Sequence, residues 1–181
     1  QDPEVISIKM TLYRMARESQ IVQALIEAAE NGKEVVALVE LRARFDEQNN
    51  IDWSKQLEEA GCTILYGFDD YKVHSKLTLI TKKGPQGYSY ITQIGTGNYN
   101  EKTSELYTDY SFITADLGIG EEASNVFQNL AVQKLTETTE KMLVAPLRFK
   151  SVLLDEMDRV INAAKLGRPA SMILKNNSIS D

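Results

Sequence analysis

The stretch Tyr71–Ile80, which reads Tyr-Lys-Val-His-Ser-Lys-Leu-Thr-Leu-Ile, contains the only histidine in the chain. Its apolar and β-branched residues predict a β-strand, and side chains two positions apart on a strand lie on the same face. We therefore expect His74 and Lys76 to project together from the start of this strand. Such a pair suits a nucleophile or base beside a cation that holds a phosphate. These residues alone leave a second interpretation open, in which His74 ends a strand and Lys76 is solvated.

The residues before this stretch predict a parallel α/β unit. Ser19 suits the N-cap of a first helix and Asp52 that of a second. Strands and helices alternate over residues 5–11, 21–29, 35–41, 52–59 and 62–66. With right-handed crossovers, this β-α-β-α-β order gives parallel strands. The continuous apolar run at 35–41 suits a strand that is covered on both faces.

The pattern changes after residue 72. Turn residues at 82–87 separate two strands, at 73–81 and 88–94, and predict a hairpin. A further strand is expected at 110–114, followed by helices at 121–135 and 152–166 on either side of Pro146. We therefore expect an α/β fold, with a mixed, mostly parallel sheet and helices on both faces.

Composition narrows the possible functions. The chain has 181 residues, of which 43% are hydrophobic and 25% charged, and this is ordinary for a globular domain. A net charge of -6 argues against general binding to nucleic acid. A single cysteine excludes an internal disulfide and a cysteine-based zinc site, and a single histidine excludes a histidine-rich metal site.

Polar residues follow the expected strand ends, where α/β sheets bind their ligands. Arg14 follows the first strand, and Arg42 and Arg44 follow the second. Arginine forks match pairs of phosphate oxygens. Each arginine is also compatible with a surface ion pair, for example with Glu18 or Asp46. Their convergence with the His74 strand favours an anion site.

A glycine-containing loop, Gly-Thr-Gly-Asn-Tyr-Asn at 95–100, follows the hairpin. Gly95 and Gly97 would let backbone amides approach an anion and form a concave nest. An ordinary tight turn is the alternative.

These motifs carry a resemblance to a known family. His74-Ser75-Lys76, followed by Gly95-Thr96-Gly97-Asn98, resembles the H-x-K … G-[S/T]-x-N pattern of the phospholipase D superfamily. The residues at 8–14, 40–46, 72–76, 95–103 and 106–109 resemble polyphosphate kinases of the first type. The chain resembles the first of the two phospholipase-D-like catalytic domains in those enzymes.

The resemblance implies an activity and a set of roles. His74 would accept the terminal phosphoryl group of ATP and pass it reversibly to inorganic polyphosphate. Lys76 and Asn98 would hold phosphate oxygens beside it, and Tyr107 would contact ATP. Arg14 and Arg44 match positions that the family associates with Mg²⁺. Because arginine cannot ligate a cation, we interpret both as clamps on phosphates that the Mg²⁺ also binds.

One departure from the superfamily pattern separates the rival functions. The H-x-K motif of phospholipase D continues to an aspartate, and Thr81 stands at that position. This favours a kinase over a phospholipase-D-like phosphodiesterase. A non-catalytic module that binds nucleotide or polyanion is a further alternative.

The resemblance also has consequences for the whole protein. We expect a catalytic domain at 1–145, and at 146–181 a helical segment that leads into a next domain and is partly disordered without it. The second half of the active site would lie outside this chain, so the chain alone should be inactive. The family further implies a cytoplasmic homo-oligomer, with peripheral membrane association at the inner face as an additional expectation.

Overall fold

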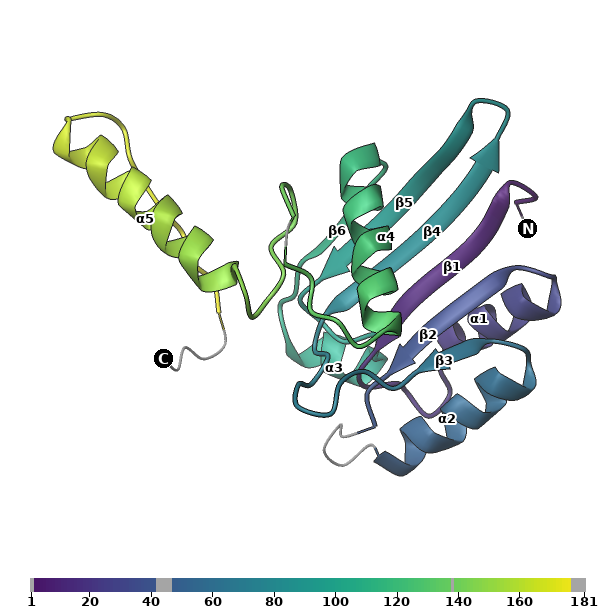
Figure 1. Cartoon of the computed structure of the whole chain (residues 1–181). Helices are drawn as coiled ribbons and strands as arrows, with labels where there is room; N and C mark the ends of the chain where they lie inside the picture. The colour runs from purple at the N-terminus through teal and green to yellow at the C-terminus, as the bar shows by residue number, and fades with distance from the viewer. Residues whose placement is uncertain (1, 42–46, 138, 177–181) are drawn as a thin grey trace. The chain divides into compact units, whose positions relative to one another are not determined.

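The computed structural model describes residues 2–41, 47–137 and 139–176 of the chain. These residues form six strands, which make one sheet in the order β3-β2-β1-β4-β5-β6, and five helices (Figure 1). The elements are, in chain order, β1 Val5–Leu12, α1 Gln20–Glu30, β2 Glu34–Val39, α2 Glu47–Glu59, β3 Thr63–Leu65, β4 Lys76–Gly84, β5 Gly87–Gly95, α3 Glu101–Leu106, β6 Ser111–Thr114, α4 Leu117–Ala131 and α5 Phe149–Lys165.

The sheet is mixed. Strand β1 pairs in parallel with β2, and β2 with β3, as the β-α-β-α-β pattern predicts. The pairs β1–β4, β4–β5 and β5–β6 are antiparallel, so four of the six strands, β1, β2, β3 and β5, run in one direction. The expected mixed sheet is confirmed. Most of its strands run in one direction, but three of its five pairings are antiparallel.

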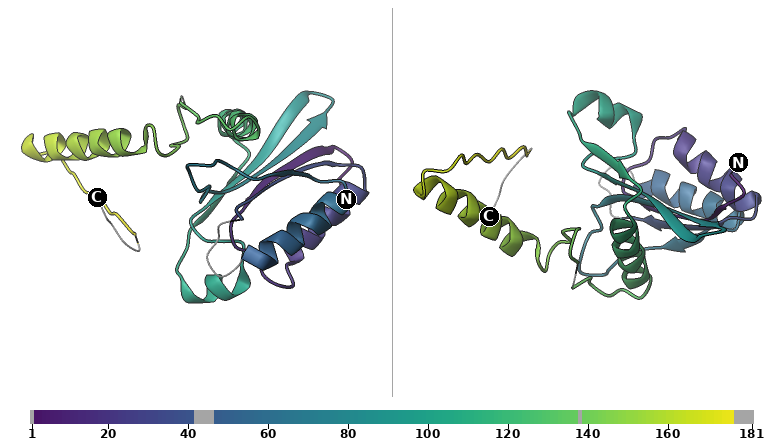
Figure 2. Two further views of the ribbon diagram at one scale, coloured as in Figure 1. Left: turned by 60° about the horizontal axis from the view of Figure 1, so that its bottom comes forward. Right: turned by 90° about the horizontal axis from the view of Figure 1, so that it is seen from above.

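Helices cover both faces of the sheet, as expected (Figure 2). Helices α1 and α2 pack on one face, against β2 and β3. Strand β2 is buried from Val35 to Val39 because alternate residues enter the cores on its two faces. The core beneath α1 and α2 consists mainly of apolar side chains: Met10, Leu12, Met15, Val22, Leu25, Val35, Ala37, Val39, Trp53, Leu57 and Cys62.

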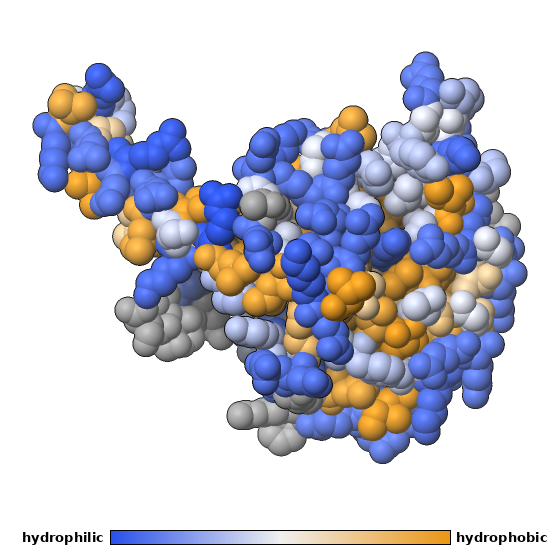
Figure 3. All heavy atoms as spheres, viewed as in Figure 1, coloured by the Kyte–Doolittle hydropathy of each residue, from blue (hydrophilic) through white to orange (hydrophobic). Residues whose placement is uncertain are grey.

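Helix α4 packs on the opposite face, against β4 and β5. Its buried side chains include Val126 and Phe127, and strand β4 contributes the buried Leu77 and Leu79. A side chain at Gly120 would overlap the Tyr90 side chain on β5, so the close approach of α4 requires a glycine there. Apolar surface remains visible beside α4 on this face (Figure 3).

Several local expectations from the sequence were wrong. Helix α4 begins at Leu117, four residues earlier than predicted, with Asp116 as its N-cap, and helix α3 was not predicted. Strand β4 begins at Lys76, three residues later than predicted, because the Val73 amide bonds to a side chain and not to a neighbouring strand. Helix α2 begins at Glu47, so Asp52 lies inside it and accepts a hydrogen bond from Gln48 at 2.8 Å instead of capping the helix. Ser19 does cap α1, accepting the Val22 amide at 3.3 Å.

Backbone contacts divide the chain into two compact units, residues 1–135 and 136–181. The first contains the whole sheet and helices α1 to α4. The second contains α5, in which the structure buries no side chain. The boundary that we expected, between residues 145 and 146, falls inside the second unit.

Candidate active site

The antiparallel pairing of β1 with β4 builds the centre of the site. Met10 is opposite Thr78, so the chain leaving the end of β1 passes the first residue of β4. The first of these segments carries Tyr13 and Arg14, and the second carries His74 and Lys76. Segments more than 60 residues apart in the sequence thereby meet at one edge of the sheet.

His74 lies in the irregular segment directly before β4, between an aromatic ring and an amine. Its ring meets Tyr13 edge to face, with centroids 4.6 Å apart and planes at 76°. Nζ of Lys76 lies 3.1 Å from Nδ1 of His74 and donates to the His74 carbonyl oxygen at 2.5 Å. The predicted proximity is therefore present, although Lys76 achieves it by folding back onto His74 and not through alternation along one strand.

Lys76 is not solvated, which removes the alternative that the sequence left open. Its exposure is 4%, and Nζ lies 5.2 Å from the centroid of the Tyr13 ring. Burial lowers the pKa of Lys76 to about 8; the carboxylate of Asp109 raises it, and the charge of Arg14 lowers it further. The group is still mostly a cation at neutral pH, held where water solvates it poorly.

The charge around His74 is positive. Partial burial lowers the pKa of the His74 imidazole below its usual 6.5, and the charges of Lys76, Arg14 and Lys72 lower it further. The ring is consequently neutral at physiological pH. A neutral imidazole has an unprotonated nitrogen, which nucleophilic chemistry requires.

Buried side chains fix the backbone on both sides of His74. Oε2 of Glu40 accepts the Val73 amide at 3.1 Å. Oγ1 of Thr11 donates to the Ser75 carbonyl at 2.8 Å and accepts the Leu77 amide at 3.0 Å. Glu40 and Thr11 are 5% and 1% exposed. His74 thus lies on a short segment that is anchored before and after it.

The predicted glycine loop lies beside Lys76. Gly95 is the register partner of Lys76, and a Cβ built on Gly95 would lie 3.5 Å from the Cβ of Lys76. A side chain at Gly97 would overlap the carboxylate of Asp109. That carboxylate accepts a hydrogen bond from Thr96 at 2.9 Å and so closes the loop onto the segment before β6. Gly97 is therefore needed for close packing, whereas a side chain at Gly95 would meet mainly the flexible end of Gln93.

The remaining predicted residues have different environments. Oδ1 of Asn98 is buried and has no hydrogen-bond partner within the described chain, so it can accept from a ligand. Arg14 is half-buried, with its guanidinium carbon 5.7 Å from the Tyr13 ring centroid. Tyr107 ends α3 and is 55% exposed. Arg44 lies outside the described residues, so its predicted role stays a prediction.

The described residues do not form a magnesium site of their own. Within that part of the chain, no group of three or more His, Cys, Asp or Glu side chains is placed to hold a metal ion. The side chains around His74 are mainly cations, and cations repel a bare metal ion. The site is suited to phosphate oxygens, including those of a nucleotide that has already bound Mg²⁺.

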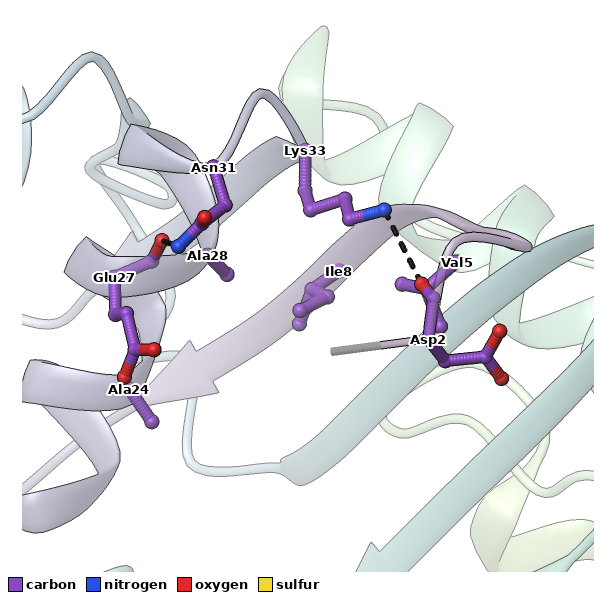
Figure 4. Close-up of a pocket in the computed structure, with 8 residues that line it drawn as sticks. All are labelled: Asp2, Val5, Ile8, Ala24, Glu27, Ala28, Asn31 and Lys33. Carbon is purple, nitrogen blue, oxygen red and sulfur yellow. Dashed lines mark hydrogen bonds between the residues drawn. The ribbon is translucent and has the colours of Figure 1, made fainter.

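A pocket of about 250 Å³ lies at the other end of β1 (Figure 4). Its lining is Asp2, Val5, Ile8, Ala24, Glu27, Ala28, Asn31 and Lys33. The Nζ atom of Lys33 closes one side by donating to the Asp2 carbonyl at 3.2 Å. None of the predicted site residues contributes to this pocket.

Sequence reasoning missed the polar residues that support the site. Glu40, Asn50 and Asp109 were not predicted to act there. Asn50 is fully buried and donates to the carbonyl oxygens of Tyr13 and Glu40, at 2.8 and 2.9 Å. A possible signal was the position of Glu40 directly after the apolar run of β2, since a carboxylate there lies beside the core.

Comparisons with known proteins show the family to which the chain belongs. Residues 1–136 match the family model described as polyphosphate kinase C-terminal domain 1. The chain belongs to this family. It is 42% identical over 181 residues to a polyphosphate kinase of Staphylococcus saprophyticus, and 44% identical over 180 residues to polyphosphate kinase 1 of Chlorobaculum tepidum. These alignments cover 100% and 99% of the chain, and 25% and 26% of the two relatives.

A solved structure confirms the family's fold in this chain. The crystal structure of polyphosphate kinase from Porphyromonas gingivalis superposes with a TM-score of 0.79 at 35% identity, covering 92% of this chain and 28% of that one. The expected phospholipase-D-like α/β fold is thereby confirmed. The chain spans about a quarter of the length of these relatives. Among the described residues, no helix has the length and apolar character needed to cross a membrane.

Proposed function

We propose that this chain is a catalytic domain of a polyphosphate kinase, and that His74 accepts the terminal phosphoryl group of ATP. The observation that carries the proposal is a neutral imidazole fixed beside a buried lysine, with Nδ1 of His74 and Nζ of Lys76 only 3.1 Å apart. The imidazole supplies a nucleophile and the lysine supplies charge for the transferred group.

The reaction consists of two displacements at phosphorus. First, the unprotonated ring nitrogen of His74 forms an N–P bond while the bond from the γ-phosphorus to the bridging oxygen breaks. ADP leaves with that electron pair. Second, a terminal oxygen of polyphosphate attacks the phosphorus, the N–P bond breaks, and the electron pair returns to the ring nitrogen. Each displacement can run in reverse, so the same residues serve synthesis and breakdown.

The residues around His74 would hold the transferred group. Lys76 and Arg14 would contribute charge, and Asn98 and the amides of Gly95 and Gly97 would contribute further polar contacts. Preorganised donors of this kind stabilise the charge that spreads over the phosphoryl oxygens. Tyr107 would contact ATP through its exposed ring, and Arg44 would contact phosphate.

Mg²⁺ would neutralise phosphate charge when it arrives with the nucleotide. The described residues offer it no ligand set, so we assign none of them to the metal. The contribution of this chain is to fix the nucleophile and to contact phosphate oxygens that the ion leaves free.

The fold alone would also suit a phosphodiesterase, but Thr81 lies within β4, paired with Tyr90, where that superfamily has an aspartate. The lowered pKa of His74 favours a chemical role over simple polyanion binding, for which a charged ring would serve better. We therefore retain the kinase as the proposed function. The cytoplasmic location, the oligomer and the membrane association implied by the family remain predictions.

The test is to label the intact enzyme with γ-³²P-ATP and to map the labelled residue. We expect label on His74 that is labile in acid and stable in base, as a phosphoramidate is. His74→Ala should abolish both labelling and turnover. Ser75→Ala, which removes the neighbouring hydroxyl, is the matched control and should be labelled normally. Normal labelling of His74→Ala would overturn the assignment.

A further inference from the structure

Glu40 is a buried acidic residue for which the proposed mechanism has no chemical step. It directly follows β2 and is 5% exposed. Acidic side chains are seldom buried this deeply because a carboxylate loses its hydration there. Here Oε2 accepts the Val73 amide at 3.1 Å, one residue before His74.

The backbone of Glu40 joins two further segments of the site. Its amide donates to the Leu12 carbonyl at 3.0 Å, at the end of β1. Its carbonyl accepts from Nδ2 of Asn50 at 2.9 Å, and the same amide group of Asn50 donates to the Tyr13 carbonyl at 2.8 Å. One residue therefore connects the segment that carries Tyr13 with the segment that carries His74.

The segment that carries His74 depends on such contacts. Residues 71–75 form neither helix nor strand, so no regular hydrogen-bond ladder holds them. Glu40 anchors Val73, and Thr11 anchors Ser75 and Leu77. His74 lies between these two anchors. Without the first, the ring would be fixed from one side only.

We propose that Glu40 is a positioning residue, which acts through the Val73 amide to hold His74 against Tyr13 and Lys76 in the geometry that phosphoryl transfer requires. This inference rests on the proposed role of His74 as phosphoryl acceptor. Misplacing a reacting group by about 1 Å can lower a rate by about a hundredfold. Glu40 makes no contact with substrate in this role, so its loss should lower the rate and leave nucleotide binding nearly unchanged.

Two substitutions separate the hydrogen bond from the charge. Glu40→Gln removes the charge but keeps an oxygen at the same reach, so it can still accept the Val73 amide. Glu40→Asp keeps the charge but draws the oxygens back by one methylene group. If positioning is the role, the glutamine variant should retain activity and the aspartate variant should lose it. If the charge acts directly, for example on a metal ion, the order should be reversed.

The experiment measures the initial rate of His74 phosphorylation by γ-³²P-ATP in the intact enzyme, together with KM for ATP. We expect Glu40→Ala and Glu40→Asp to be about a hundredfold slower, with KM changed less than about threefold. Glu40→Gln should remain within about fivefold of wild type. Leu57→Ala, a core truncation at a side chain that makes none of these hydrogen bonds, is the control for lost stability and should be normal per folded molecule.

The outcomes distinguish this inference from the proposed function. If the wild-type enzyme carries no label on His74, the proposed function fails. If it is labelled, normal rates in both Glu40→Ala and Glu40→Asp would overturn the positioning role, as would a Glu40→Gln variant as slow as Glu40→Asp. An equal loss of phosphorylation rate in Leu57→Ala would also overturn the positioning role, because the loss would then result from lower stability. Should Glu40→Ala fail to fold, the comparison of Gln with Asp still decides.

Discussion

Two lysines on strand β4 have opposite environments. Lys76 begins β4 at the candidate site, is 4% exposed, and has a pKa lowered to about 8. Lys82, six residues further along β4, meets Asp2 at 2.8 Å and Glu4 at 3.2 Å, and hydrogen bonds with these carboxylates raise its pKa. Lys82 is therefore paired with carboxylates of the same chain. Lys76 is instead placed where it can bind the anion of a ligand.

The contrast explains why only one end suits phosphate chemistry. Lys82 would gain little binding energy from a phosphate, because it would first have to break its contacts with Asp2 and Glu4. Lys76 has lost water without gaining a close carboxylate of comparable strength, so a phosphate group relieves that cost. Burial combined with positive neighbours, and not positive charge alone, distinguishes the site.

We expect the largest effect on activity when each of the two lysines is replaced in turn. Lys76→Met should lower kcat/KM for ATP by about a thousandfold in the intact enzyme, since a preorganised charge next to the reacting phosphorus is lost. Lys82→Met should leave kcat/KM within about twofold, because its partners are carboxylates at a distant end of the sheet. Steady-state kinetics with both variants measures this. A loss below tenfold in Lys76→Met would show that the buried lysine is not part of the machinery.

The arginines should give the next largest effect. Arg14→Ala and Arg44→Ala should each lower kcat by about a hundredfold, the scale for removing one donor to the developing charge. Lysine substitutions should rescue only partly, because the two-point fork is lost. Near-normal kcat in both alanine variants would make these residues surface charges.

Replacing Lys76 should increase the stability of the fold although it lowers the activity. The lowering of its pKa from 10.5 to about 8 corresponds to an unfavourable free energy of about 3 kcal/mol for the buried cation. Lys76→Met should therefore raise the free energy of unfolding by about 1–3 kcal/mol at pH 7. Between pH 8 and 10.5 the unfolded chain binds more protons at this residue, so wild-type stability should gain from rising pH there. Denaturant titrations at pH 7 and pH 9.5 check both statements, and a loss of stability in Lys76→Met would contradict them.

The pH dependence of kcat/KM should show the smallest effect. The pKa of His74 is lowered from 6.5, so the neutral ring should be lost only below pH 6.5. Lys76 loses its charge as the pH rises through about 8, so kcat/KM should fall about tenfold per pH unit beyond that value. The profile of Lys82→Met should coincide with that of wild type. An alkaline limb that begins only above pH 10 would mean that Lys76 is solvated in the enzyme.

The parts of the fold that follow local rules could be predicted from the sequence. Periodicity identified the strands and most helices, and Ser19 marked the start of α1. The errors lie where tertiary contacts compete with local pattern. A strand that included Val73 is a reasonable prediction from the sequence, but the buried carboxylate of Glu40 takes the Val73 amide and delays β4 until Lys76.

The candidate site was predictable in its chemistry more than in its geometry. His74, Lys76 and the loop containing Gly95 and Gly97 were identified from residue types and spacing. No sequence rule showed that Lys76 would be buried and folded back onto His74, or that Glu40 and Asn50 would connect the strand ends. Those features depend on pairings between distant segments, which a single sequence does not reveal.

The bond between Thr11 and the Ser75 carbonyl closes a loop of 64 residues. Helices α1 and α2 and strands β2 and β3 all lie within that loop, so the segments carrying Tyr13 and His74 are brought together only when β4 docks on β1. Contacts of such long sequence separation form late and slowly in folding. We expect a nascent chain on the ribosome to show no affinity for phosphate until β4 has emerged from the exit tunnel. Affinity for the ligand would then report that β4 has paired with β1.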